Sequence, residues 1–402
     1  MNIKLSEQKL SISPSVTLSI DAKTKQMRAD GIDVISFGVG EPDFKTPENI
    51  RNKAIDLIQK GTIGYTAASG LPELKRTICD KLKRDNNLSY HPDDIIVSNG
   101  AKHSLFNAFQ AICNPGDEVI IPIPYWVSYP EIVKMASAIP IFVECSEKNE
   151  FKLKKEDLLS AITSKTKAIM LNSPSNPTGA VYSKSELEEI AEIAIKNNII
   201  VVSDEIYEKL VYDGETHTSI ASLNEAIKEK TIVINGMSKG YAMTGWRIGY
   251  TASSRSIAKI MGNFQSHTTS NPNTIAQYAS IEGLGGDQSS VEKMRKAFDA
   301  RRKYMVNRIN QIEGLSCIVP KGAFYVMMNI SGLIGKEIYG KVITNSIDLA
   351  DIILENANVA IVPGIAFGSD EFVRLSYATS LENIELGLNR IANCLNYQIN
   401  FC

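Results

Sequence analysis

Residues 168–207 read AIMLNSPSNPTGAVYSKSELEEIAEIAIKNNIIVVSDEIY, and this stretch decides the fold of the chain. It opens with the apolar run AIML (168–171) and leads to a second apolar run, IIVVS (199–203). Between the two runs, Ser183 and Glu186 have the spacing of a capping box at the start of a helix. The apolar residues that follow at helical spacing are Leu187, Ile190, Ala191 and Ala194. The stretch therefore predicts a strand, a crossover helix and a second strand.

Similar apolar runs recur on both sides of this stretch. They are IIVS (95–98), EVIIP (118–122), IFVE (141–144), TIVIN (231–235) and IGYTA (248–252). Runs that are apolar on both faces are typical of inner strands in a sheet that helices cover on both sides. We therefore expect an α/β fold whose large domain holds a mostly parallel, seven-stranded sheet. Ligands of such sheets gather beyond the carboxyl ends of the strands.

The last hundred residues show a different pattern, which predicts a smaller α+β domain. A helix-compatible stretch, 289–313, precedes them, and the segment 331–344, rich in Gly and Lys, is expected to be a loop. Strand candidates are AFYVMM (323–328) and VAIVP (359–363), and helix candidates are 347–355 and 381–394. We assign residues 1–46 to an N-terminal arm and part of the small domain, 47–292 to the large domain, and 293–402 to the small domain.

Composition excludes several classes of function. The 402 residues are 44% hydrophobic, and 43 basic side chains nearly balance 45 acidic ones, so small molecules rather than nucleic acid or membranes are the expected partners. The N-terminal MNIKLSEQKL lacks the apolar core of a secretory signal, which leads us to expect a cytoplasmic protein. Six cysteines without a Cys-x-x-Cys pair and four histidines without a His-Glu-x-x-His arrangement predict no metal site and reduced thiols.

Polar clusters follow three of the expected strands, namely NSPSNPTG (172–179), SDEIY (203–207) and NGMSKGYAMTGWRIG (235–249). Asn176 lies in the first, although Asn-Pro-Thr-Gly is also an ordinary turn. Asp204 directly follows a strand, where a helix N-cap is the alternative interpretation. Lys239 also follows a buried strand, where its amine loses hydration, and a simple pair with Asp204 is the alternative interpretation.

Three of these side chains meet the needs of one cofactor. Pyridoxal phosphate requires an amine to form a Schiff base, an acid beside its pyridine nitrogen and a cation for its phosphate. Lys239, Asp204 and Arg247 supply these groups. Desolvation lowers the pKa of a lysine toward neutrality, which lets the amine attack a carbonyl and carry a proton between carbon atoms.

The motifs NPTG, SDEIY, SKGYAMTGWRIGY, GEPDF (40–44) and RLSYATS (374–380) resemble, in order and spacing, the class I, fold-type I, pyridoxal-phosphate-dependent aminotransferases. The resemblance covers nearly the whole chain and is closest to the bacterial aspartate aminotransferase subgroup that includes thermophilic enzymes. It implies transfer of an amino group from L-aspartate to 2-oxoglutarate, giving oxaloacetate and L-glutamate. The alternatives are a prephenate, aromatic or other aminotransferase, and a lyase using the same cofactor.

The resemblance also implies roles for residues around the cofactor. Lys239 would be the Schiff-base lysine and the acid/base, and Asp204 would pair with the pyridine nitrogen. Tyr207 and Asn176 would hydrogen-bond the 3′-oxygen of the cofactor. Trp126, in PYWVSYP, would stack on the ring, with a plain core tryptophan as the alternative.

For the phosphate, the resemblance implies Arg247, Ser238 and the turn Gly100-Ala101-Lys102, which opens a helix expected to run to Ile112. The start of a helix presents backbone N–H groups to an anion. Tyr65 would reach the phosphate of the neighbouring subunit, which implies a homodimer with shared active sites. Without the resemblance, Tyr65 is an ordinary loop aromatic.

The resemblance also implies contacts with the substrate. Arg374 would bind the α-carboxylate in a bidentate manner, with a surface salt bridge as the alternative interpretation. Gly40 would bring its backbone close to that carboxylate. The resemblance implies that Ser15, Thr17 and Lys102 hold the second carboxylate of aspartate.

The chain departs from the family pattern at two positions. Many members have a serine near the phosphate where this chain has Gly236. Some members that also use prephenate have a lysine where this chain has Ser13, which favours aspartate over prephenate. A cofactor-binding regulator is a further alternative, but residues 1–46 are too short and insufficiently basic to be a DNA-binding module.

Overall fold

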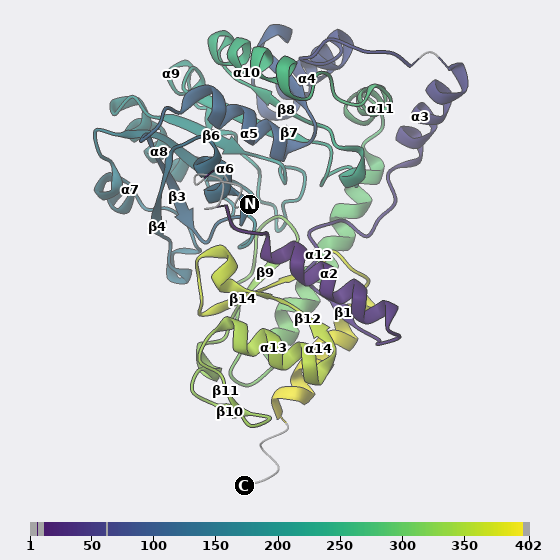
Figure 1. The fold of residues 1–402 in the computed structure, drawn as a ribbon, viewed down its shortest axis with the longest axis vertical. Coiled ribbons are helices and arrows are strands. Elements are labelled where there is room, and N and C mark those ends of the chain that lie inside the picture. The colour runs from purple at the N-terminus through teal and green to yellow at the C-terminus, as the bar shows by residue number, and fades with distance from the viewer. Residues whose placement is uncertain (1–5, 7–11, 62, 397–402) are drawn as a thin grey trace, which may run out of the picture.

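The computed structural model describes residues 6, 12–61 and 63–396 (Figure 1). A large sheet with its helices forms the upper part in Figure 1, and smaller sheets with their helices form the lower part. Helix α12 (Ser289–Ile309) runs between the two parts. Apart from Ser6, the N-terminal decapeptide discussed above lies outside the described residues, as does Cys402.

The large sheet has seven strands in the order β2-β8-β7-β6-β5-β3-β4. Their bounds are Ile95–Ser98, Gly249–Ala252, Thr231–Gly236, Ile200–Asp204, Thr166–Asn172, Glu118–Ile123 and Ile139–Glu144, in that order. Strand β8 runs antiparallel to both of its neighbours, and the other pairs are parallel. The prediction of a mostly parallel, seven-stranded sheet is therefore confirmed.

Helices cover both faces of this sheet because successive residues of each strand point to opposite sides. Ile121 and Val202 pack against one helix layer, and Ile120 and Val201 pack against the other. The first layer contains α5 (Ala101–Ile112), α6 (Ser128–Met135) and α10 (Arg255–Thr268). The second contains α7 (Lys155–Ala161), α8 (Lys184–Lys196) and α9 (Glu225–Lys228). Burying each aliphatic side chain of this kind contributes about 1.5–3 kcal/mol relative to leaving it exposed.

The crossover helix α8 begins where the sequence predicts. The Ser183 side chain accepts from the backbone N–H of Glu186, and the Ser183 backbone N–H donates to Glu186 Oε2 at 2.7 Å. Both halves of the capping box are thus present, and loss of such a serine cap costs about 1 kcal/mol. The helix carries the chain from the carboxyl end of β5 back to the start of β6, which fixes the two strands as parallel neighbours.

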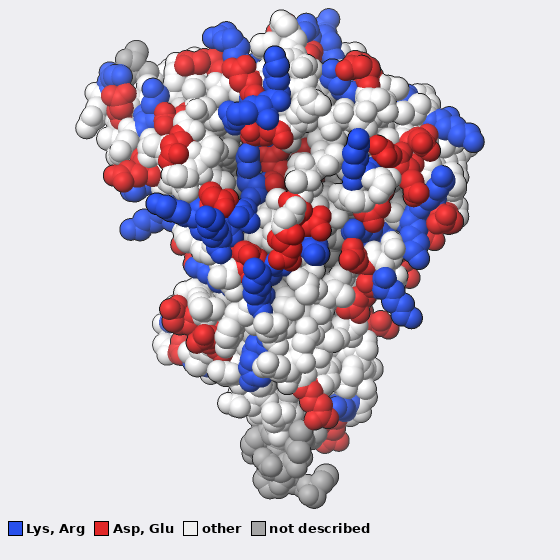
Figure 2. All heavy atoms as spheres, turned by 180° about the vertical axis from the view of Figure 1, so that it is seen from behind, with Lys and Arg blue, Asp and Glu red and all other residues white. Residues whose placement is uncertain are grey.

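The remaining helices near the large sheet are α3 (Glu48–Lys60), α4 (Pro72–Asn86) and α11 (Thr274–Gly285), and they share a core with Val97 and Val233. Basic and acidic side chains are interspersed over the face in Figure 2. None of the described helices combines the length and the apolar composition that a bilayer-spanning helix needs.

The smaller sheets lie in the lower part. Strands β13 (Val362–Pro363), β14 (Phe372–Ser376) and β9 (Tyr325–Asn329) form one antiparallel sheet. Strand β1 (Ile35–Ser36) pairs in parallel with β12 (Val359–Ala360). The helices of this part are α2 (Val16–Ala29), α13 (Ser346–Ala357) and α14 (Leu381–Leu395).

Three expectations for this part are wrong in detail. The run 359–363 is divided between two sheets, because β12 pairs with β1 while β13 pairs with β14. The expected loop 331–344 contains a hairpin of β10 (Glu337–Ile338) and β11 (Lys341–Val342). Helix α12 ends at Ile309 rather than at 313, and the Asn310 side chain instead bonds both backbone groups of Cys317.

Candidate active site

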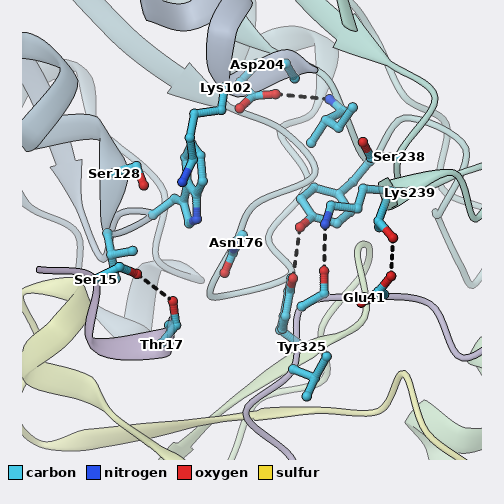
Figure 3. Close-up of a pocket in the computed structure, with 18 of the residues that line it drawn as sticks. Ser15, Thr17, Glu41, Lys102, Ser128, Asn176, Asp204, Ser238, Lys239 and Tyr325 are labelled. Atoms are coloured by element: carbon cyan, nitrogen blue, oxygen red, sulfur yellow. Dashed lines mark hydrogen bonds between the residues drawn. The ribbon is translucent and has the colours of Figure 1, made fainter. Parts of the chain in front are cut away.

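A cavity of about 380 Å³ lies beyond the carboxyl ends of β5, β6 and β7, between the large sheet and β14 (Figure 3). It brings together residues that the sequence analysis drew from distant segments. Those in its wall are Ser15, Thr17, Gly40, Ala101, Lys102, Trp126, Asn176, Asp204, Tyr207, Ser238, Lys239, Arg247 and Arg374. Amine, acid and guanidinium therefore meet in one place, as the cofactor argument requires.

Lys239 stands three residues after the end of β7 and points into the cavity. Its Nζ donates to the carbonyl oxygen of Gly40 at 2.6 Å. Burial lowers the pKa of Lys239 to about 8, and the nearby carboxylate of Glu41 opposes that shift. The alternative of a simple pair with Asp204 is wrong, because the amine bonds the Gly40 carbonyl instead.

The glycine that departs from the family pattern has a packing reason. A Cβ atom on Gly236 would lie 2.7 Å from the carbonyl oxygen of Ile248 and 2.9 Å from Cα of Gly249. Both of those atoms belong to backbone next to β7, so neither can move aside cheaply. A serine at this position would have to displace β8, and Ser238 is the nearby serine that lines the cavity.

Asp204 is the last residue of β6 and is buried. Its Oδ2 accepts from the Tyr129 hydroxyl at 2.8 Å, and its Oδ1 accepts from the Ile206 backbone N–H at 3.2 Å. Burial raises the pKa of Asp204 to about 6, and these two hydrogen bonds oppose the rise. The N-cap interpretation is wrong, because a turn rather than a helix follows.

Tyr129 is a residue that the sequence analysis missed. It lies three residues after Trp126, in the first turn of α6, and its ring packs edge to face against Trp126 at 5.3 Å between centroids. Trp126 lies before α6 begins, so no helical spacing pointed to Tyr129, whose role comes from its contact with Asp204 in the folded chain.

A second corner of the cavity is built around the start of α5, which begins at Ala101 and ends at Ile112 as expected. Gly100 precedes the helix with a φ of 86° and has no side chain with which to cap it. A Cβ atom on Gly100 would lie 2.2 Å from Nη2 of Arg247, and one on Gly249 would lie 2.3 Å from the Ala101 backbone nitrogen. The two glycines therefore let a guanidinium and a strand approach the helix start closely.

Arg247 is held over this corner by backbone oxygens. Its Nη1 donates to the Thr244 carbonyl at 2.8 Å, and its Nη2 donates to the Asn99 carbonyl at 3.4 Å. Because neither partner is an acid, the positive charge remains available to an anion at the helix start.

Arg374, on β14, is 2% exposed, so the alternative of a surface salt bridge is wrong. Its Nη1 donates to Asn176 Oδ1 at 3.0 Å, and its Nη2 donates to the Gly38 carbonyl at 2.7 Å. Its buried Nε has no hydrogen-bond partner among the described residues. A buried guanidinium with an unsatisfied N–H is costly unless a ligand supplies the acceptor.

The third corner contains Ser15, Thr17 and Lys102, which lie together in the cavity wall (Figure 3). The hydroxyl oxygens of Ser15 and Thr17 are 3.0 Å apart at the start of α2. Nζ of Lys102 sits 4.9 Å above the ring centroid of Trp126, and burial, with the charge of Arg247, lowers the pKa of Lys102. Hydroxyls and an amine in this arrangement can hold a carboxylate.

Tyr207 is buried, and its hydroxyl oxygen lies 2.9 Å from that of Tyr325. Tyr325 lies within the strand candidate 323–328, and no sequence motif indicated a role for it. Tyr65, in contrast, is 96% exposed and is not part of the cavity wall in its own chain.

The described residues include one group whose side chains could hold a metal ion, formed by Glu205, Glu208 and His217. Lys81 forms an ion pair with Glu208, and His217 and Ser219 bond Glu205 at 3.1 and 2.6 Å. Protein donors thus occupy both carboxylates, and the group lies outside the cavity wall.

Comparison with known proteins identifies the family of the chain. Residues 32–391 match the family model described as aminotransferase class I and II. A protein of Bacillus sp. strain YM-2, named aspartate aminotransferase, is 52% identical over 380 residues, which are 94% of this chain and 96% of that protein.

Two solved structures are also similar over nearly their whole length. The aspartate aminotransferase from Rhizobium meliloti has a TM-score of 0.95 at 43% identity, with 98% of this chain and 99% of that chain covered. The aspartate aminotransferase from Thermus thermophilus with maleate has a TM-score of 0.92 at 40% identity, with 98% and 100% covered. The family match over most of the chain means that this protein belongs to the class I and II aminotransferases.

Proposed function

We propose that the protein is a pyridoxal 5′-phosphate-dependent aspartate aminotransferase, which transfers the amino group of L-aspartate to 2-oxoglutarate and yields oxaloacetate and L-glutamate. The observation that carries the proposal is that Lys239, Asp204 and Arg247 line one cavity in a member of the aminotransferase family. The name of the 52% identical Bacillus relative supports aspartate as the amino donor.

The donor set fits the cofactor. Arg247 and the uncapped start of α5 suit a phosphate dianion, and the glycines at 100 and 249 leave the space that side chains would fill. Asp204, in the same cavity wall, suits a protonated ring nitrogen. When bound, pyridoxal phosphate supplies an aldehyde that condenses with amines and a ring that withdraws electrons from the substrate.

Lys239 is the proton carrier in this proposal. With a pKa of about 8, a useful fraction of its Nζ is neutral near pH 7 to 8 and can accept the proton of the substrate α-carbon. Its bond to the Gly40 carbonyl keeps the amine inside the cavity. Within the same half-reaction, this Nζ would then deliver the proton to the former aldehyde carbon of the cofactor, which completes the 1,3-proton shift.

The other cavity residues orient the ring. Ionised Asp204 would hold the proton on the ring nitrogen, and Tyr129 would keep that carboxylate in place. Tyr207 and Asn176 would bond the 3′-oxygen, while Trp126 would stack on the ring face. Buried, fixed donors of this kind stabilise developing charge without reorganising during the reaction.

Substrate recognition would use the two ends of the dicarboxylate. Arg374 would bind the α-carboxylate, and its buried Nε, which lacks a partner among the described residues, supports this role because a carboxylate would supply an acceptor. Ser15, Thr17 and Lys102 would bind the second carboxylate. The Thermus relative was solved with maleate, itself a dicarboxylate.

We further propose a cytoplasmic homodimer with shared active sites and the domain ranges given above. Tyr65 is available to a second subunit because it is almost fully exposed. Ile55 and Ile58, on one face of α3, are 50% and 55% exposed, and Ile63 is 44% exposed. Four exposed apolar or aromatic side chains close in sequence favour burial against another protein surface.

Amino-donor profiling of the cofactor-loaded protein tests the proposal. Single amino acids are added without an acceptor, and the keto acid and the spectrum of the bound cofactor are recorded. L-Aspartate should yield oxaloacetate and convert the cofactor to its amine form, which 2-oxoglutarate should reverse. Prephenate as the preferred acceptor, a branched-chain or aromatic donor preference, or release of ammonia with a lyase product would contradict it.

A further inference from the structure

Two phenols in the cavity wall, which come from different sheets, are in direct hydrogen-bond contact. Tyr325 is the first residue of β9, and Tyr207 lies three residues after the end of β6. Their hydroxyl oxygens are 2.9 Å apart, and both side chains are buried. Figure 3 shows Tyr325 reaching toward the part of the cavity that holds Lys239.

Only one proton lies between the two oxygens, so the direction of this hydrogen bond matters. A hydroxyl has one O–H to donate but can also accept. If Tyr207 donated to Tyr325, it could not donate to a ligand. If Tyr325 donates, the Tyr207 O–H is free to point into the cavity, and the incoming bond strengthens it as a donor.

The surroundings favour Tyr325 as the donor. The guanidinium of Arg374 lies 4.5 Å above the Tyr325 ring centroid. Burial raises the pKa of both phenols; Arg374 is the main group opposing the rise at Tyr325, whereas Tyr325 itself raises the pKa of Tyr207 further. Tyr325 is thus the more acidic phenol, and the more acidic of two hydroxyls is the better donor.

We infer that Tyr325 is a positioning residue: its hydroxyl donates to Tyr207 and thereby aims the Tyr207 O–H at the 3′-oxygen of the cofactor. Gly40 makes room for this arrangement, because a Cβ atom there would lie 2.8 Å from the Tyr325 hydroxyl oxygen. Tyr325 pairs with Ser376 on β14, the strand that also carries Arg374. The guanidinium of Arg374 and the hydroxyl of Tyr325 therefore sit on adjoining strands of one sheet.

The test rests on the proposed function and reads the cofactor rather than turnover. The pH midpoint of the absorbance of bound pyridoxal phosphate is measured for wild type, Tyr207→Phe, Tyr325→Phe and the double variant. A donor to the 3′-oxygen stabilises its negatively charged form, so weakening that donor raises the midpoint. Losing one such bond shifts it by about one unit.

Tyr325→Phe should raise the midpoint by less than Tyr207→Phe does, and the double variant should match Tyr207→Phe, because Tyr325 acts only through Tyr207. The control is Tyr212→Phe, which removes another buried phenol, bonded to the Ala323 carbonyl at 2.5 Å, and should leave the midpoint unchanged. An unchanged or lowered midpoint for Tyr325→Phe, or additive shifts in the double variant, would overturn the inference.

Two further variants separate a failure of the inference about Tyr325 from a failure of the proposed function. Gly40→Ala crowds the Tyr325 hydroxyl while leaving both phenols present, and it should raise the midpoint as Tyr325→Phe does; no rise would count against the inference. If wild type bound no cofactor, or if Lys239→Ala kept the same absorbance, the proposed function itself would fail. If the wild type titrates normally and Tyr325→Phe has the same pH midpoint as the wild type, only the role of Tyr325 is rejected.

Discussion

At the single residue Lys239, burial of the amine that function requires lowers the stability of the folded chain. Burial lowers its pKa from 10.5 to about 8, so below pH 8 the folded chain holds an ammonium that prefers water. The unfolded chain binds the proton more tightly. The cost is fully present below pH 8 and disappears as the pH rises toward 10.5.

We therefore expect Lys239→Met to stabilise the cofactor-free protein at pH 7, by about 1–3 kcal/mol. Denaturant unfolding measures the difference, which should shrink between pH 8 and 10.5. The control is Lys303→Met, which removes an exposed lysine paired with Asp299 and should change little. Equal stability of Lys239→Met and wild type at pH 7 would show that the amine carries no burial cost.

Asp204 should set a pH dependence on the acid side, because its ionised form is the functional one. Its carboxylate form is needed beside the ring nitrogen, and its pKa of about 6 means that this form is lost as the pH falls through 6. Tyr129→Phe removes a donor to the carboxylate, so the pKa should rise further. We expect the acid limb of the pH dependence of pyridoxal phosphate affinity, measured on the cofactor-free protein, to move up by roughly 0.5–1 pH unit. An unmoved limb would separate Tyr129 from the function of Asp204.

At the scale of elements, the start of α5 is the feature on which phosphate binding depends. Gly100→Ala places a Cβ atom on the Arg247 guanidinium, and we expect it to weaken pyridoxal phosphate binding by about tenfold or more, a loss of about 1.4 kcal/mol. Fluorescence titration with the cofactor measures the Kd. Gly116→Ala is a matched control, because Gly116 has a φ of 88° but nothing within 4 Å of the added atom. Equal effects of the two variants would assign the loss to backbone strain alone.

The elements also show what the sequence could predict. The seven strands and α8 were predictable because burial on both faces and the capping box at Ser183 are local signals. The division of 359–363 was not, because the run itself does not say which strand it will pair with. The polar residues that follow the strands in the sequence correctly indicated much of the cavity wall. Tyr129 and Tyr325 were missed because their roles depend on contacts with Asp204 and Tyr207, which only the folded chain creates.

The proposed homodimer, in which two subunits share each active site, can be tested with mixed subunits. If Tyr65 completes the site of its neighbour, mixing Lys239→Ala with Tyr65→Phe subunits should restore activity, because each hybrid dimer has one site that is intact in both residues. Unfolding and refolding the two variants together, with each refolded alone as the control, tests this. Absence of recovery in verified hybrid dimers would place Tyr65 outside the active site.

The proposed function depends on Lys239 as the amine at which the cofactor attaches, within a cavity that also presents Asp204 and Arg247. Its most direct test is borohydride reduction of the cofactor-loaded protein, which makes the amine–aldehyde bond permanent, followed by peptide mass spectrometry. We expect the added mass of reduced pyridoxal phosphate to be found on Lys239. The label on another lysine, such as Lys102 in the same wall, or no label at all, would contradict it.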